Sequence, residues 1–230
     1  MSKKIKYIVA AVLAAVVCVA VIFTINRKKS GINMNVGELS GDEQNYWNPD
    51  IHSISKAENG YYYLHYDGKD LLVKYFDESS KRSVPVCAKA ECSHNSKTCN
   101  AWLDTDEYLS SPIYYYKNNI YVVRVEGGMA KLVSIKADGS DRKDVANLFA
   151  NDRTSISMVF HNGYVYAYDH IGHIGSSESG KEIIKKINIS DGSSQDIVEY
   201  EGENSAVMGA RSYGDKLFYK IFQYSINKQT

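Results

Sequence analysis

The stretch Asn162-Gly163-Tyr164-Val165-Tyr166-Ala167 joins a two-residue turn to alternating aromatic and aliphatic side chains. Asn-Gly is a strong signal for a tight β-hairpin, and the alternation that follows predicts a half-buried strand. Three more segments have the same form: Asn59 to Leu64, Asn118 to Val123 and Gly214 to Tyr219. The expected turn positions 60, 119, 163 and 215 are 59, 44 and 52 residues apart. A repeat of this length predicts a stack of similar supersecondary units.

Each unit carries the signals of four short antiparallel strands. The first strands are expected at Ile51 to Ile54, Pro112 to Tyr116, Ile156 to Phe160 and Ala206 to Ala210. The aromatic strands follow the turns. Third strands are expected at Lys131 to Ile135 and Ile183 to Ile189, and fourth strands at Lys143 to Leu148 and Gln195 to Tyr200. Since no helical pattern separates them, the prediction is an all-β chain, specifically a β-propeller of about three and a half four-stranded blades.

Three and a half blades cannot close a ring, and an open ring leaves strand edges unpaired. We therefore expect a partial product of a six- to eight-bladed protein, or an open stack of sheets that dimerises through its edge. Residues 49–230 are assigned to this partial propeller, with an inserted segment at 84–104.

Two segments after the second and third hairpins, Leu132 to Lys143 and Lys186 to Ser193, resemble blade strands of TolB-like and YWTD-type propellers. The resemblance covers residues from about 50 to 230. It implies the propeller fold but no particular activity, because such folds include both receptors and enzymes.

The N-terminus is a candidate membrane anchor. Residues 7–25 contain no charged side chain, and as a helix they would be about 28 Å long, close to the thickness of a bilayer core. We expect residues 1–29 to form a single-pass signal anchor in the cell membrane, with the bulk of the chain outside. A cleaved signal peptide is the alternative. Residues 30–48 are expected to be a polar linker.

The segment Cys87-x4-Cys92-x-His94-x4-Cys99 is the strongest candidate site. Three thiolates and one imidazole are the donor set of a tetrahedral zinc site, and such a site would be structural because no coordination position stays open. A disulfide between two of the cysteines, or unreactive thiols, are the alternatives. The segment, which ends in Cys99-Asn100-Ala101, resembles a Cys-x4-Cys-x-His-x(n)-Cys-Asn-Ala segment of uncharacterised surface propellers from Gram-positive anaerobes.

Two other groups of residues are weaker candidates for a site. A metal or acid–base role for His161, His170 and His173 is less favoured than that of solvated loop histidines. The acidic residues Asp138, Asp141 and Asp144 do not have the spacing of a calcium loop, so turn chemistry and solvent exposure are the expected roles.

The amino-acid composition limits the classes of partner and function that the chain can have. Lysine plus arginine equals aspartate plus glutamate at 27 each, so the chain has no basic excess for a nucleic-acid partner. The 19 tyrosines suit half-buried strands or a platform for sugars and peptides. We predict a non-catalytic module that binds a protein or glycan at the propeller rim, with candidate contacts at Tyr114, Tyr116, Tyr166 and Tyr168. A carbohydrate-active enzyme, or a sensory or scaffold domain of a larger membrane protein, are the alternatives.

Overall fold

The computed structural model describes residues 46–48, 51–108, 110–150, 155–174, 180–213 and 216–224. All of them belong to one compact unit, Met34–Thr230. This part of the chain is all-β, as predicted, apart from one helical turn, α2 (Thr105–Tyr108). The predicted anchor lies outside the described residues, and within them no helix is long and apolar enough to cross a membrane. Residues 46–48, expected in the linker, form a strand.

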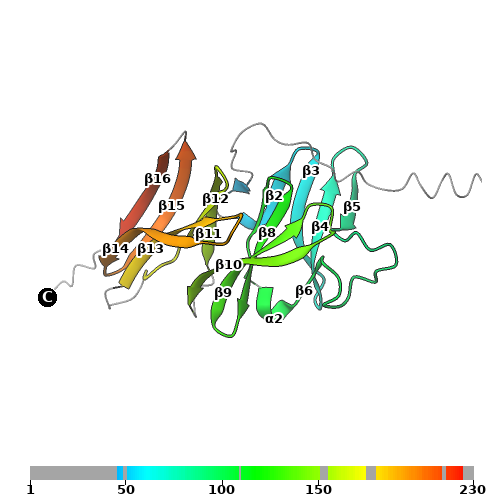
Figure 1. Cartoon of the computed structure of the whole chain (residues 1–230), viewed down its shortest axis with the longest axis horizontal. Coiled ribbons are helices and arrows are strands. Elements are labelled where there is room, and N and C mark those ends of the chain that lie inside the picture. Colours follow the sequence, from blue (N-terminus) through cyan, green and yellow to red (C-terminus); the bar gives the residue numbers. More distant parts are fainter. Residues whose placement is uncertain are drawn as a thin grey trace, which may run out of the picture. The chain divides into compact units, whose positions relative to one another are not determined.

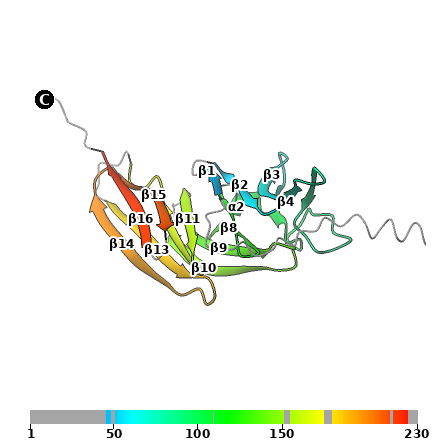
Figure 2. The same cartoon turned by 90° about the horizontal axis from the view of Figure 1, so that it is seen from above.

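The described strands form four antiparallel sheets, in which consecutive strands pair except that β6 pairs with β4 (Figures 1 and 2). The first sheet contains β1 (Tyr46–Asn48), β2 (Ile51–Ala57), β3 (Gly60–Tyr66), β4 (Leu71–Asp77), β5 (Arg82–Pro85) and β6 (Trp102–Leu103). The second sheet contains β7 (Ile113–Tyr116), β8 (Asn119–Glu126), β9 (Met129–Lys136) and β10 (Arg142–Ala150).

The third sheet contains β11 (Ile156–His161), β12 (Tyr164–Asp169), β13 (Gly180–Asn188) and β14 (Ser194–Gly202). The fourth sheet contains only β15 (Ser205–Tyr213) and β16 (Lys216–Gln223). The predicted strands of the repeats therefore exist and agree with the observed ones to within a few residues.

Two residues separate the first long strand of each sheet from its hairpin partner, because the last pairs of these hairpins are Ala57↔Gly60, Tyr116↔Asn119, His161↔Tyr164 and Tyr213↔Lys216. The prediction of turns at Gly60 and Asn119 was wrong by one residue, since each begins the following strand. Both turn residues of the second hairpin, Lys117 and Asn118, have positive φ. Gly60 is required for a different reason: a Cβ atom there would lie 2.0 Å from the carbonyl oxygen of Phe76.

Equal turn lengths place equivalent side chains on the same face of every sheet. The third residue of the second strand in the hairpin is aromatic in all four sheets: Tyr62, Tyr121, Tyr166 and Phe218. The Tyr62 ring stacks on Tyr115 of the second sheet, with centroids 5.2 Å apart. The Tyr121 ring lies 4.8 Å from Phe160 of the third sheet. We call the face that carries these residues the forward face, because it packs against the sheet that comes next in the chain.

The hydrophobic core consequently lies between successive sheets. Between the second and third sheets it contains a cluster of buried residues from both: Tyr114, Tyr116, Tyr121, Val123, Ala130, Leu132, Leu148, Phe149, Ile156, Met158, Phe160, Val165, Ala167 and Ile187. Between the third and fourth sheets a smaller cluster contains Val159, Tyr168, Ile184, Val207 and Ala210, with Tyr166 and Leu217 packed against it.

Hydroxyl groups also bridge neighbouring sheets. Each accepts a hydrogen bond from a backbone N–H in the first strand of the hairpin in the next sheet: Ser55 Oγ from Tyr115 (2.8 Å), Tyr114 Oη from Met158 (3.1 Å) and Tyr168 Oη from Ala210 (3.2 Å). β7, β11 and β15 pair with only one strand each, so their remaining N–H groups need partners outside the ladder. The three hydroxyl groups are such partners for one N–H group in each of these strands, where neighbouring sheets pack together.

This packing overturns the expected role of the tyrosines. Tyr114, Tyr116 and Tyr168 are buried, and the hydroxyl of Tyr116 accepts a hydrogen bond from the backbone of Gly163. Tyr166 is partly buried against the core cluster of the third and fourth sheets. The prediction that they contact a ligand was wrong for the three buried rings, because the next sheet covers the face on which they lie.

Candidate metal centre

The Cys/His loop, residues 86–101, interrupts the outermost strand of the first sheet. β5 pairs with β4 at Lys74 to Asp77, and β6 pairs with the same strand at Leu71 and Leu72. The loop leaves the sheet after β5 and returns to it at β6. Its two ends are held by Val73, whose N–H donates to the carbonyl of Ala101 and whose carbonyl accepts from Val86, both at 2.9 Å.

The four predicted ligands converge within this loop. The Sγ atoms of Cys87, Cys92 and Cys99 and a ring nitrogen of His94 all lie within 4.8 Å of one another. His94 Nδ1 lies 3.3 Å from Cys99 Sγ. Zinc–sulfur bonds of about 2.3 Å in a tetrahedron place sulfur atoms roughly 3.8 Å apart. The prediction that these residues come together is therefore confirmed, and their arrangement is compatible with a metal site.

Local backbone turns aim the side chains inward. Cys92 N–H donates to the carbonyl of Lys89 at 3.4 Å, and Cys99 N–H donates to the carbonyl of Ser96 at 3.0 Å. Between them His94 adopts a left-handed conformation with φ of 56°. A left-handed non-glycine residue costs roughly 1–2 kcal/mol, so the fold must recover that energy elsewhere.

The thiols differ in their environments. Cys99 is fully buried, and this burial raises the pKa of its thiol to about 11. Cys92 is only half-buried, and a hydrogen bond from the backbone of His94 lowers the pKa of its thiol. The three cysteines are free. Metal binding would have to displace the proton of Cys99, which makes affinity depend on pH.

The turn between β9 and β10 of the second sheet packs directly against the loop. Gly139 has φ of 74°, and a Cβ atom on it would lie 2.5 Å from the backbone nitrogen of Cys87. The Gly139 carbonyl accepts hydrogen bonds from Ala88 N–H (3.3 Å) and Asn100 Nδ2 (2.9 Å). Only glycine fits this contact.

Arg142, the first residue of β10, makes a second connection. Its guanidinium donates to the carbonyls of Trp102 at 2.6 Å and Lys97 at 3.3 Å. The sequence did not single out Arg142, because an arginine that binds carbonyl groups far along the chain has no local pattern. Together with Gly139 it fastens the Cys/His loop to the second sheet.

The other histidines do not converge on one another. His170 Nδ1 lies 3.1 Å from Ser157 Oγ, and His173 Nδ1 lies 2.7 Å from a carboxylate oxygen of Glu182. His161 lies beside the amide of Asn162. Among the described residues, the only group of three or more His, Cys, Asp or Glu side chains placed to share a metal is the Cys/His cluster.

The acidic residues have the roles expected from the sequence. Asp138 Oδ1 accepts a hydrogen bond from Ser140 N–H at 2.9 Å, which is ordinary turn chemistry. Asp141 is exposed, and Asp144 forms a 2.6 Å ion pair with Arg124. At the end of β4, Asp77 accepts hydrogen bonds from Ser80 N–H (2.6 Å) and Ser79 Oγ (2.8 Å), and these bonds lower its pKa to about 2.

Comparison with known proteins returned no matching family model, curated protein or solved structure.

Proposed function

We propose that the Cys/His loop holds a structural zinc ion and that the chain is a non-catalytic interaction module built on a partial β-propeller. The observation that carries the proposal is the convergence of Cys87, Cys92, His94 and Cys99 within 4.8 Å. Three thiolates and one imidazole fill a tetrahedron, so no position remains for a substrate or a reactive water.

The presence of His94 in the cluster favours zinc over a disulfide. A disulfide would use two sulfur atoms and would give the imidazole no reason to lie 3.3 Å from Cys99 Sγ. The loop also has little regular structure of its own, since it forms turns and no strand between β5 and β6. Metal-binding energy is then available as folding energy for the loop.

The propeller is supported by the repetition of the sheets. The second and third sheets each contain four strands in sequence order, as a propeller blade does. Each of the first three forward faces packs on the next sheet through the same aromatic position. The resemblance of residues 132–143 and 186–193 to TolB-like and YWTD-type blades agrees with this arrangement.

In this proposal residues 1–29 tether the module to the cell membrane and the propeller faces outward. The uncharged run of residues 7–25 supports the tether. Loops on a rigid β-scaffold are suited to recognition, and the ligand is a protein or a glycan at the rim. The zinc site contributes by holding a long inserted loop in one conformation against the second sheet.

Metal analysis of the purified full chain tests the site. We expect one zinc per chain, loss of the metal in Cys92→Ser, and retention in Ser93→Ala, which changes an exposed neighbour whose hydroxyl donates to Asn95 Oδ1. Absence of metal, with two of the three loop cysteines oxidised, would show a disulfide instead. A glycan array and a hydrolase panel test the module: retained binding without turnover is expected, and turnover would overturn the assignment.

A further inference from the structure

The three cysteines of the Cys/His loop differ in how firmly the fold holds them. Cys99 is fully buried, and the carbonyl of Lys97, two residues before it, accepts a hydrogen bond from Arg142 at 3.3 Å. The backbone of Cys87 packs against Gly139 of the second sheet. Both cysteines are therefore held at the ends of the loop, where it meets the second sheet.

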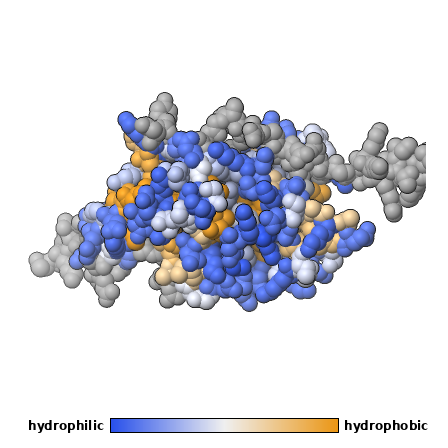
Figure 3. All heavy atoms as spheres, in the orientation of Figure 1, coloured by the Kyte–Doolittle hydropathy of each residue, from blue (hydrophilic) through white to orange (hydrophobic). Residues whose placement is uncertain are grey.

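Cys92 lies in the loop tip, which we define as residues 89–96. Within the tip Cys92 and His94 are partly buried, and the other residues are exposed. In the described part of the chain, the hydrogen bonds of the tip residues all go to other residues of the Cys/His loop. Figure 3 shows hydrophilic residues at the end of the molecule that carries this loop. Cys92 is thus partly open to solvent, and no hydrogen bond from outside the loop restrains the tip.

Cys87 is the cysteine best placed to form a bond with Cys92. Both residues are partly exposed, whereas Cys99 is buried. The two Sγ atoms lie within 4.8 Å of each other. A disulfide bond is about 2.05 Å long, so its formation needs an approach of less than about 2.8 Å. The tip can supply this movement while β5 and β6 keep their pairing with β4.

We propose that the loop is a redox switch, in which a peroxide oxidises Cys92 and a disulfide between Cys87 and Cys92 then removes two ligands from the zinc. The inference rests on the proposed zinc site and concerns its regulation. It assigns different roles to the three cysteines: Cys92 reacts with the oxidant, Cys87 resolves the product, and Cys99 stays a thiol.

The reaction has two steps. The Cys92 thiolate attacks one oxygen of hydrogen peroxide, so that an S–O bond forms, the O–O bond breaks and hydroxide leaves. The Cys87 thiolate then attacks the Cys92 sulfur, so that the S–S bond forms, the S–O bond breaks and a second hydroxide leaves. Each hydroxide takes up a proton. The two sulfur atoms together lose two electrons, and the peroxide is reduced to two molecules of water.

Loss of the two thiolates leaves only His94 and Cys99 to hold a metal, which is too few for a tetrahedral site, so the zinc dissociates. The ends of the loop stay fastened to the second sheet through Gly139 and Arg142. The switch therefore changes the surface of one loop on the module and leaves the sheets folded.

Peroxide treatment of the zinc-loaded full chain in detergent tests the inference. The zinc content is measured first under reducing conditions, and hydrogen peroxide is then added with a chromogenic chelator. We expect release of the bound zinc, a Cys87–Cys92 disulfide in non-reducing peptide mapping, and a free thiol at Cys99. Trypsin places the three cysteines in separate peptides, because Lys89 and Lys97 lie between them. Far-ultraviolet circular dichroism should not change.

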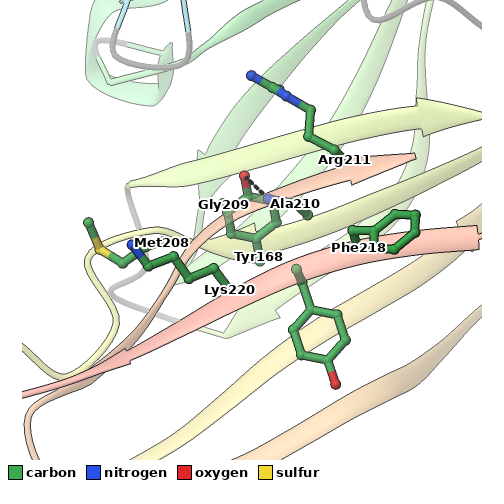
Figure 4. A pocket seen from close by; sticks show the side chains of 8 residues that line it. Tyr168, Met208, Gly209, Ala210, Arg211, Phe218 and Lys220 are labelled. Atoms are coloured by element: carbon green, nitrogen blue, oxygen red, sulfur yellow. Dashed lines mark hydrogen bonds between the residues drawn. The ribbon is translucent and has the colours of Figure 1, made fainter. Parts of the chain in front are cut away.

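Met208 supplies an internal reference for unspecific oxidation. Its thioether is 50% exposed on β15 (Figure 4), and peroxide converts such a side chain to the sulfoxide. The disulfide should form before Met208 is oxidised, because an accessible thiolate is the stronger nucleophile. A disulfide that appears only together with Met208 sulfoxide would overturn the inference.

Two variants separate the roles of the cysteines. Cys92→His leaves two thiolates and two imidazoles, which is also a zinc-binding donor set. Peroxide should release zinc from this variant at least about tenfold more slowly, since its remaining pair includes the buried Cys99. Ser93→Ala is the matched control and should release zinc at the native rate. If Cys92→His binds no zinc, peptide mapping of the native chain decides.

The outcomes distinguish the switch from the zinc site itself. A chain that binds zinc but keeps it in peroxide, or that forms a different disulfide, for example through Cys18, would overturn the switch and leave the zinc site intact. A reduced chain that binds no zinc would refute the zinc site, and the switch with it, before any peroxide is added.

Discussion

The hydroxyl bridges between sheets can be tested by removing a single oxygen atom. Tyr114→Phe deletes the acceptor of the Met158 N–H hydrogen bond, in a fully buried position between the second and third sheets. The ring and its packing stay in place, and the side-chain hydrogen bond between Tyr114 and Ser157 is removed together with the bridge. The N–H of Met158 would then be buried without its partner.

The expected cost is about 1–3 kcal/mol of unfolding free energy, the usual penalty for an unsatisfied buried donor. For a chain of this length, that corresponds to a fall in Tm of roughly 2–12 °C. Tyr75→Phe is the matched control. The Tyr75 ring packs 4.8 Å from Tyr62 and is equally buried, but its hydroxyl has no hydrogen-bond partner among the described residues. Its removal should cost nothing, or should stabilise by up to about 1 kcal/mol.

Urea unfolding at fixed zinc concentration, followed by far-ultraviolet circular dichroism, measures both variants against the native chain. Of these two chemically identical substitutions, only Tyr114→Phe should lower the free energy of unfolding. Equal unfolding free energies for Tyr114→Phe and Tyr75→Phe would refute the idea that hydroxyls satisfy the free edge of the next sheet.

Three further predictions concern the loop and its neighbours. Gly139→Ala should destabilise by at least about 1–3 kcal/mol more than Gly163→Ala in thermal unfolding, because both glycines have positive φ but only Gly139 touches backbone. With the metal chelated, iodoacetamide should alkylate Cys92 faster than Cys99 in mass spectrometry, since the pKa shifts have opposite signs; the reverse order would contradict the assigned environments. The pKa of Asp77 falls from 3.8 to about 2, so its stabilisation is complete above pH 3.8 and is lost towards pH 2; Asp77→Asn should flatten acid unfolding in that window.

The strands were predictable because their signal is local. Hairpin turns and alternating apolar residues act over a few positions, and the observed β11 and β12 lie within two residues of the predicted segments. The turn residues were less predictable. Gly60 is the first residue of β3, and its close contact is with Phe76, which lies 16 residues further along the chain and leaves no local pattern.

The sequence could not predict in the same way which face of each strand is covered by another sheet. Alternation shows that Tyr114 and Tyr116 point to one side, but not whether another sheet covers that side. Burial depends on which sheets stack, and that is set by contacts between residues more than 40 positions apart, such as Tyr114 and Met158. This is why residues expected at a binding rim lie in the core.

The Cys/His cluster was predicted in part. Its four side chains fall within 13 residues, so the sequence predicted both the members and their convergence. The anchorage to Gly139 and Arg142 was not predictable, because those residues belong to the next sheet and their partners in the loop are mostly backbone atoms.

The constant two-residue hairpins impose a rule on how this chain can change through evolution. An extra residue in one of these turns would invert the pleat of the strand after it, so that a buried tyrosine would point to the wrong neighbour. Insertions and deletions should therefore be rare at these reversals. They should be more frequent in the loop between β5 and β6. These two strands pair separately with β4, so a change in the length of the loop alters the register of neither strand.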